Sequence, residues 1–137
     1  MFKLLSYEQL LHLRLSFNHS SHFIFKTLSA KRESLLARRG NVWFANIPNL
    51  WLLRDTDGDG RTDGPKDIRK PVFTGFGVRV GFLGHDLHGL TLGPDGKLYF
   101  SIGDRGANVK SLEGKTVAAP EMGAIFRCNQ DGSDLEI

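Results

Sequence analysis

The sequence predicts an all-β fold that follows a segment of a different kind. From Gly40 onward, short runs rich in aromatic, β-branched and leucine residues alternate with acidic glycine turns, a pattern typical of strands. Glycine is distributed just as unevenly, because 15 of the 16 glycines come after residue 40. Two kinds of sequence are therefore joined near Gly40.

The segment before Gly40 is basic. Residues 1–40 hold seven Lys and Arg against two Glu, whereas residues 41–137 hold eleven basic and thirteen acidic residues. The basic residues form no arginine cluster with interleaved aromatics, so we expect a solvated, weakly structured leader and no nucleic-acid partner. Glu8, His12 and Arg14 interrupt its apolar runs, which argues against a signal peptide. Residues 7–17 are a candidate helix, and residues 30–39 are either a helix or a strand from Leu35 onward.

The strands expected after Gly40 fall into pairs. Cys128 is the only cysteine, which excludes an internal disulfide and a cysteine zinc cluster. Each pair is joined by a short turn containing Pro, Gly or Asp. The predicted strands are residues 41–46 and 50–55 around Pro48, 71–76, 87–92 and 97–103, and 123–129 and 134–137.

Two of the turns repeat at a fixed distance. The Asp-Gly pairs at 95–96 and 131–132 lie 36 residues apart. Short strands with turns at this spacing indicate repeated four-stranded sheets, as in the blades of a β-propeller. The part of the chain after Gly40 is long enough for about two blades, and a propeller needs at least about four to close. We therefore expect a piece of a larger fold.

The central hairpin, residues 87–103, has a predicted register. A bulged type I turn with Gly96 in the left-handed conformation pairs Leu92 with Leu98, Leu90 with Phe100 and His88 with Ile102. This register places apolar residues opposite apolar residues. It also brings residues 85–88 beside residues 102–105, so we expect the histidines and Asp104 to be neighbours in space.

The stretch "DTDGDGRTDGPKD", residues 55–67, matches the first half of a calcium loop. Carboxylates occupy its first, third, fifth and ninth places, and glycine its sixth: Asp55, Asp57, Asp59, Asp63 and Gly60. The twelfth place holds Lys66 where a bidentate carboxylate is expected, and Asp67 comes one place later. Two interpretations stay open, a calcium site formed by the four aspartates and an acidic hairpin turn in solvent.

His85 and His88 are candidates for a general base. A neutral imidazole in this role needs a partner that fixes its tautomer, and Asp104 is a suitable residue. The alternatives are residues that decorate a strand edge, or metal ligands that lack a third partner nearby. Arg105 and Asn108 follow in the glycine-rich turn "GDRGAN", where they either face a ligand or serve the turn itself.

Three stretches together resemble a known family: "NVWFANIPNLWLLRDTDGDG", "TGFGVRVGFLGHDLHGLTLGPDGKLYFSIGDRG" and "GAIFRCNQDGSDLE". They are similar to the membrane-bound dehydrogenase propellers of bacteria, which are related to soluble glucose and sorbosone dehydrogenases that use pyrroloquinoline quinone (PQQ). The resemblance covers residues 34–137 and leaves residues 1–33 unmatched. It implies a six-bladed propeller with the cofactor above one end of the central channel.

The resemblance also implies roles for individual residues. In the sugar dehydrogenases a histidine opens the strand before the Gly-Pro-Asp turn, and an aspartate closes the strand after it. His85 and Asp104 match these positions, as the base that takes the substrate hydroxyl proton and the residue that orients it. Those enzymes carry glycine where His88 stands here, and the predicted register also favours His88, so His88 remains the rival base. Arg105 and Asn108 are the candidate cofactor-binding residues.

The function implied by the resemblance is that of a fragment of a PQQ-type sugar or alcohol dehydrogenase, inactive alone. Its partners would be the substrate, a cytochrome electron acceptor and the missing blades of the full-length protein. Its expected location is extracytoplasmic or membrane-associated. The alternative is a non-catalytic propeller segment that binds a glycan, a protein or calcium.

Overall fold

The computed structural model describes residues 34–78 and 85–137, which form strands, turns and loops without a helix. An all-β fold is thereby confirmed for this part of the chain. The expected leader and the candidate helix at residues 7–17 lie outside the described residues. Ser34–Arg38 forms a strand, which decides between the two alternatives left open for that stretch.

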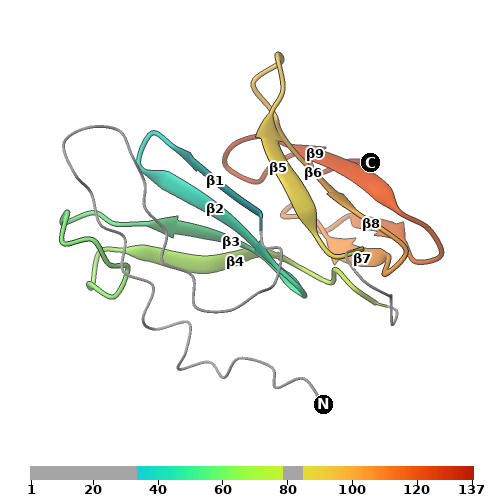
Figure 1. The fold of residues 1–137 in the computed structure, drawn as a ribbon, viewed down its shortest axis with the longest axis horizontal. Coiled ribbons are helices and arrows are strands. Elements are labelled where there is room, and N and C mark those ends of the chain that lie inside the picture. The colour runs from blue at the N-terminus through green and yellow to red at the C-terminus, as the bar shows by residue number, and fades with distance from the viewer. Residues whose placement is uncertain (1–33, 79–84) are drawn as a thin grey trace.

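The first sheet is an antiparallel meander of four strands, in the order β1-β2-β3-β4 (Figure 1). Its strands are β1 (Ser34–Arg38), β2 (Asn41–Asn46), β3 (Asn49–Arg54) and β4 (Ile68–Thr74). A two-residue turn joins β2 to β3, because Asn46 pairs with Asn49 across Ile47 and Pro48. Pro71 has no N–H to donate, and it lies in the edge strand β4, where a proline is tolerated.

The two central strands of this sheet bury side chains on both faces. Trp43 and Ala45 of β2 belong to the main core, whereas Val42 and Phe44 belong to a second apolar cluster. Strands with two buried faces have nearly continuous apolar sequences, as in "NVWFAN" and "NLWLLR". The second cluster consists of Val42, Phe44 and Leu53, with Leu35, Ala37 and Trp51 packed against them.

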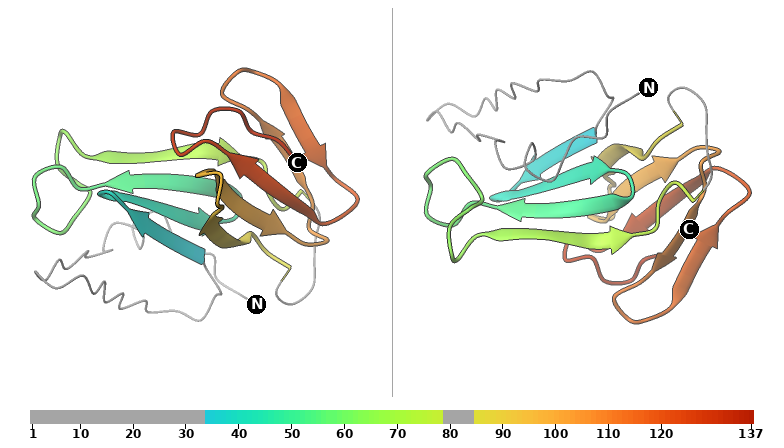
Figure 2. Two further views of the ribbon diagram at one scale, coloured as in Figure 1. Left: turned by 90° about the horizontal axis from the view of Figure 1, so that it is seen from above. Right: turned by 90° about the horizontal axis from the view of Figure 1, so that it is seen from below.

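The second sheet has three strands in the order β5-β6-β9, and a separate hairpin, β7–β8, lies between β6 and β9 in the sequence (Figure 2). The strands are β5 (His88–Leu92), β6 (Leu98–Ile102), β7 (Ala107–Lys110), β8 (Thr116–Ala119) and β9 (Ala124–Cys128). β7 and β8 are not among the strands predicted from the sequence. Each has only four residues, and small side chains fill half of the buried positions.

A shared aromatic core joins the two sheets. Phe76 follows the first sheet, and its ring meets Phe100 of β6 and Phe126 of β9 edge-on, at centroid distances of 5.8 and 5.6 Å. Phe100 and Phe126 are paired across the strands, and their rings stack 5.5 Å apart. The sheets also meet at β1 and β5, where the Leu90 amide donates to Ser34 Oγ at 2.9 Å.

The register of the β5–β6 hairpin agrees with the prediction near the turn and departs from it further along. Leu92 pairs with Leu98, and Gly96 has the expected positive φ of 77°. His88, however, pairs with Ser101 and not with Ile102, so that part of the prediction is wrong. Gly89 has a φ of 73°, and the register shifts between His88 and Thr91. This bulge adds a residue on β5, so the side chains that precede it point to the opposite face from the one predicted.

The predicted strand at 134–137 is present only as an isolated bridge. Arg127 and Glu136 exchange two backbone hydrogen bonds, at 2.9 and 3.0 Å, so this segment lies beside β9. Within residues 34–78 and 85–137, the three sheets do not close into a ring.

Candidate functional site

Charged side chains meet at one end of the second sheet, where the chain enters β5 and leaves β6. The Gly103 amide donates to the carbonyl oxygen of His85 at 3.1 Å, which joins the two segments. A tight turn follows, because the Gly106 amide donates to Gly103 O at 3.1 Å, and Gly106 has a φ of 63°. Asp104 and Arg105 are the two central residues of this turn, so their side chains project from the end of β6.

His85 and Asp104 form the first pair at this end. Nδ1 of His85 lies 2.8 Å from Oδ1 of Asp104, and the two side chains are 50% and 55% exposed. A carboxylate at this distance favours the tautomer with the proton on Nδ1, which leaves Nε2 unprotonated in the neutral ring. The arrangement thus offers an oriented, solvent-accessible imidazole base.

Asp86 and Arg105 form a second pair beside the first. Nη1 of Arg105 donates to Oδ1 of Asp86 at 2.5 Å. Arg105 also extends toward the segment that follows the first sheet, since a Cβ atom added to Gly77 would lie 3.6 Å from Arg105 Nε. That Nε atom is buried and has no hydrogen-bond partner among the described residues. Two consecutive residues before β5 therefore pair with two consecutive residues after β6.

His88 does not take part in these pairs. Its Nδ1 lies 2.5 Å from the carbonyl oxygen of Asp86, and its Nε2 lies 3.5 Å from Ser101 Oγ. The bulge at Gly89 causes these contacts, because it places His88 opposite Ser101. The predicted pairing of His88 with Ile102, which favoured His88 as the partner of Asp104, is therefore wrong.

Asn108, the other candidate cofactor residue, lies at the start of the β7–β8 hairpin. Its backbone amide donates to Gly75 O at 2.8 Å, which links this hairpin to the end of the first sheet. Its side chain is exposed and has no hydrogen-bond partner among the described residues. Of the two candidate cofactor residues, Arg105 is therefore paired with Asp86, whereas the Asn108 side chain is hydrogen-bonded to none of the described residues.

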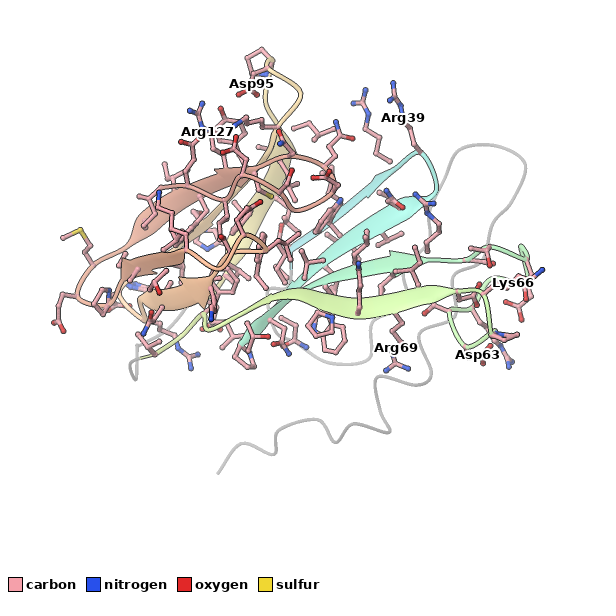
Figure 3. All side chains as sticks on the ribbon, turned by 180° about the vertical axis from the view of Figure 1, so that it is seen from behind. Arg39, Asp63, Lys66, Arg69, Asp95 and Arg127 are labelled. Carbon is pink, nitrogen blue, oxygen red and sulfur yellow. The ribbon has the colours of Figure 1, made fainter. Side chains whose placement is uncertain are left out.

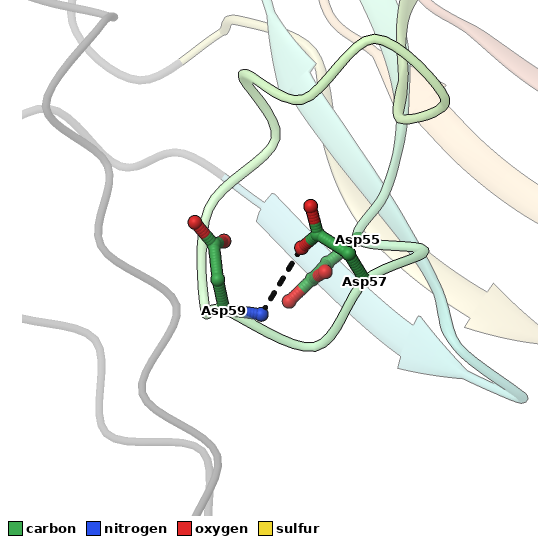
Figure 4. Close-up of side chains that lie close together, drawn as sticks. All are labelled: Asp55, Asp57 and Asp59. Atoms are coloured by element: carbon green, nitrogen blue, oxygen red, sulfur yellow. Dashed lines mark hydrogen bonds between the residues drawn. The ribbon is translucent and has the colours of Figure 1, made fainter.

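The acidic loop between β3 and β4 brings three of its aspartates together. Ligand oxygens of Asp55, Asp57 and Asp59 all lie within 4.8 Å of one another (Figure 4). Asp55 accepts hydrogen bonds from the Gly58 and Gly60 amides at 2.6 and 2.8 Å, which curls the loop around its carboxylate. Asp63 is not in this group, and its carboxylate lies 3.8 Å from Arg61 Nη1.

Asp67 closes the same loop as an acceptor of backbone hydrogen bonds. Its carboxylate accepts from the Thr56 amide and hydroxyl and from the Gly64 amide, each at 2.8 Å. The Thr56 amide, followed by the Thr56 hydroxyl and the Gly64 amide, lowers the pKa of Asp67. This aspartate therefore stays ionised while it holds the loop closed.

A third group of charged residues lies around the β5–β6 turn and includes Asp95 and Arg127 (Figure 3). It is well separated from the acidic loop, which carries Asp63 and Lys66. Asp95 accepts from the Tyr99 hydroxyl at 2.8 Å, and Arg127 Nε donates to Glu136 at 2.7 Å. Lys97 Nζ donates to Asp134 at 2.7 Å and to Glu136 at 3.3 Å. These contacts attach the C-terminal segment to the second sheet.

Sequence reasoning missed Asp86 and the close contact at Gly103. The two dipeptides His85-Asp86 and Asp104-Arg105 have complementary charges, and the predicted hairpin places them near each other. That complementarity is the signal that would have identified Asp86. Nothing in the sequence pattern would have identified Gly103, because a glycine after a strand is also an ordinary turn residue.

One comparison with known proteins identifies a family. The sequence profile of a domain of unknown function (DUF7133) matches residues 20–137. The chain belongs to this family. The match begins ahead of residue 34, where the resemblance began in the sequence analysis. Neither the curated proteins nor the solved structures contain a match to this chain. None of the described residues forms a helix that is long and apolar enough to cross a membrane.

Proposed function

We propose that this member of the family is part of a β-propeller dehydrogenase that oxidises a hydroxyl group of a sugar or alcohol. Four features support the propeller. The first sheet is a four-stranded antiparallel meander, as a blade is. The second sheet reaches four segments once Glu136 is counted beside β9. The first strands of the two sheets, β1 and β5, are in contact. The first sheet is apolar on both faces, as expected for a blade between two neighbours.

The observation that carries the chemistry is the 2.8 Å contact between His85 Nδ1 and Asp104 Oδ1. Oxidation of an alcohol removes a proton from the hydroxyl oxygen and a hydride from the carbon that bears it. A base with its second nitrogen open to solvent is suited to the first of these tasks. The His85 side chain is half exposed and its Nε2 has no hydrogen-bond partner among the described residues, whereas His88 has one ring nitrogen at a backbone carbonyl and the other near Ser101.

The chain's own residues would act in sequence. Asp104 keeps the proton of the neutral imidazole on Nδ1 and stabilises the ring once it becomes positive. Nε2 of His85 accepts the proton of the substrate hydroxyl as the C–H bond breaks. Asp86 and Arg105 neutralise each other beside this pair, so they hold the turn without adding net charge. General-base assistance of this type is worth about 10²–10⁴ in rate.

PQQ, when bound, supplies the ortho-quinone that accepts the hydride and with it both electrons. The quinone carries carboxylates, for which a guanidinium group is a suitable partner. Arg105 has one amino group engaged by Asp86 and a buried Nε without a partner among the described residues, so its hydrogen-bonding capacity is not exhausted. Arg105 and Asn108 are the residues that would contact the cofactor, with further contacts supplied by other blades. A cytochrome would then take the electrons.

The test is a dehydrogenase assay on the protein with its complete propeller. The apoprotein is mixed with PQQ and calcium, and dye reduction is followed with a panel of sugars and simple alcohols. Substrate-dependent reduction that requires PQQ supports the proposal. If PQQ neither binds nor supports reduction with any member of the panel, the dehydrogenase proposal is wrong.

A second candidate function is a calcium-binding propeller segment without catalysis. The approach of Asp55, Asp57 and Asp59 within 4.8 Å favours it, since alternate carboxylates that converge are the usual way to surround this ion. Calcium binding without any quinone affinity would support this candidate over the dehydrogenase.

A further inference from the structure

The contact between Gly103 and His85 is closer than any side chain at position 103 would permit. A Cβ atom added to Gly103 would lie 2.8 Å from Cβ of His85, 3.1 Å from its Cα and 3.2 Å from its Cγ. Non-bonded carbon atoms are optimally about 3.5–4.0 Å apart. Because Cα and Cβ belong to the backbone frame, a change of the His85 rotamer cannot relieve the overlap.

The backbone conformation is not the reason for glycine at this position. Gly103 lies outside the left-handed region that favours glycine, unlike Gly89, Gly96 and Gly106 of the same hairpin and turn. Any residue can adopt its φ without strain. What position 103 requires is space, and the atoms that occupy this space are those of His85.

Glycine also recurs on the other side of Gly103. A Cβ atom added to Gly123 would lie 2.9 Å from Ile102 O and 3.2 Å from Gly103 Cα. The end of β6 is therefore flanked by His85 on one side and by Gly123, directly before β9, on the other. The Gly103 amide bonds to His85 O at 3.1 Å, so His85 is held against a backbone that carries no side chain.

We propose that Gly103 is a positioning residue, whose missing side chain sets the separation between the His85 imidazole and the Asp104 carboxylate. Asp104 follows Gly103 directly, so the approach of His85 to position 103 also limits how close His85 comes to Asp104. A methyl group at position 103 pushes the two segments apart and breaks the 2.8 Å contact. The importance of this contact for catalysis rests on the proposed function, whereas the positioning itself does not.

The first experiment observes the His85 ring directly. Ring-nitrogen NMR spectra are recorded on the 137-residue chain labelled with ¹⁵N-histidine, and His85→Gln identifies the His85 signals. The wild-type ring should show one protonated nitrogen, Nδ1, and one unprotonated nitrogen, Nε2. We expect Gly103→Ala to shift both signals toward the average of the two tautomers.

Gly96→Ala is the matched control for a general loss of stability. It lies in the same hairpin at a φ of 77°, and an added Cβ there would meet nothing within 4 Å. This variant should lower the melting temperature through backbone strain and keep the wild-type His85 spectrum. If folded Gly103→Ala keeps that spectrum, or if Gly96→Ala loses it, the proposal is overturned.

A double-mutant cycle covers the case in which Gly103→Ala does not fold. His85→Gly removes the two side-chain atoms that an alanine at 103 would meet, although His85 Cα remains. If Gly103→Ala alone does not fold, the chain that carries both substitutions should fold. If both fold, the fall in melting temperature caused by Gly103→Ala should be smaller in the His85→Gly chain than in the wild-type chain. An equal fall, or failure of the double variant to fold where His85→Gly alone folds, overturns the proposal. Neither readout uses enzyme activity, so this proposal and the dehydrogenase proposal fail separately.

Discussion

His85 Nδ1 lies 2.8 Å from Asp104 Oδ1, although the two residues are separated by the whole length of the β5–β6 hairpin. The bulge at Gly89 and the close approach at Gly103 bring them together, and the same bulge keeps His88 away from Asp104. The geometry therefore distinguishes two histidines that sequence reasoning could not separate.

The first prediction concerns this distinction. Under the proposed function, His85→Ala should lower kcat about 10²–10⁴-fold, the usual contribution of a general base. His88→Ala should change kcat far less, because His88 contacts Asp86 O and Ser101. Steady-state kinetics with matched melting curves test both variants. A large loss with His88→Ala and none with His85→Ala would exchange their roles.

The second prediction concerns Asp104. Asp104→Asn replaces the carboxylate by an amide, which can present its NH₂ group to Nδ1 and so select the other tautomer. The amide can also present its oxygen to the Nδ1 proton, so part of the population keeps Nε2 free as the base, and we expect a smaller fall in kcat than with His85→Ala. In the His85→Ala background, Asp104→Asn should have little further effect, because the ring that it orients is gone. Additive losses would show that Asp104 acts independently of His85.

The third prediction concerns the acidic loop. Calcium should bind with a Kd on the order of 10⁻⁴–10⁻³ M, the weak class expected without a bidentate acid at the twelfth place. Asp59→Ala removes a ligand oxygen and should abolish this binding, whereas Asp63→Ala should preserve it, because Asp63 lies outside the group of three. Titration calorimetry measures both. Absence of heat at millimolar calcium would leave the loop as a hydrogen-bonded hairpin turn.

The fourth prediction concerns acid stability. The hydrogen bond from Lys97 lowers the pKa of Asp134, and bonds from Arg127 and Lys97 lower that of Glu136. A carboxylate with a lowered pKa in the folded state stabilises the fold above its unfolded pKa, near 3.8 for Asp and 4.5 for Glu. This stabilisation is lost as the pH falls below these values. The melting temperature should therefore decline below a pH of about 4.5.

Lys97→Met should flatten this decline, since it removes a partner of both acids. Lys70→Met is the control, because Lys70 is exposed on β4 and forms no ion pair with a described residue. Melting curves recorded between neutral and strongly acidic pH compare the three chains. Equal slopes for Lys97→Met and the wild-type chain would contradict the assignment.

The fifth prediction concerns the core between the sheets. Phe126 is 0% exposed and contacts the rings of Phe76 and Phe100, so Phe126→Ala should lower the free energy of unfolding by about 3–5 kcal/mol. Ile125 is its neighbour on β9 but is 67% exposed. Ile125→Ala should change stability by less than about 0.5 kcal/mol, and denaturant unfolding measures both. Similar effects for the two variants would argue against a core centred on Phe126.

Local features were predictable from the sequence alone. Asp95-Gly96 required a bulged turn, and the alternation of Leu98, Phe100 and Ile102 defined the buried face of β6. The pairing of Leu92 with Leu98 followed from these two facts. Turn chemistry and period-two burial depend on a few neighbouring residues, so they can be inferred without knowledge of the rest of the molecule.

Only the tertiary structure decided which side chains meet. One bulge at Gly89 moved His88 from Ile102 to Ser101, because the side-chain period of a strand is two and a shift of one residue reverses every face beyond it. The contact of His85 with Gly103, and that of Arg105 with Asp86, depend on how closely two distant backbone segments approach. Such distances depend on packing between segments far apart in the sequence, such as that of Phe76 against Phe100 and Phe126, and no short stretch of sequence contains them.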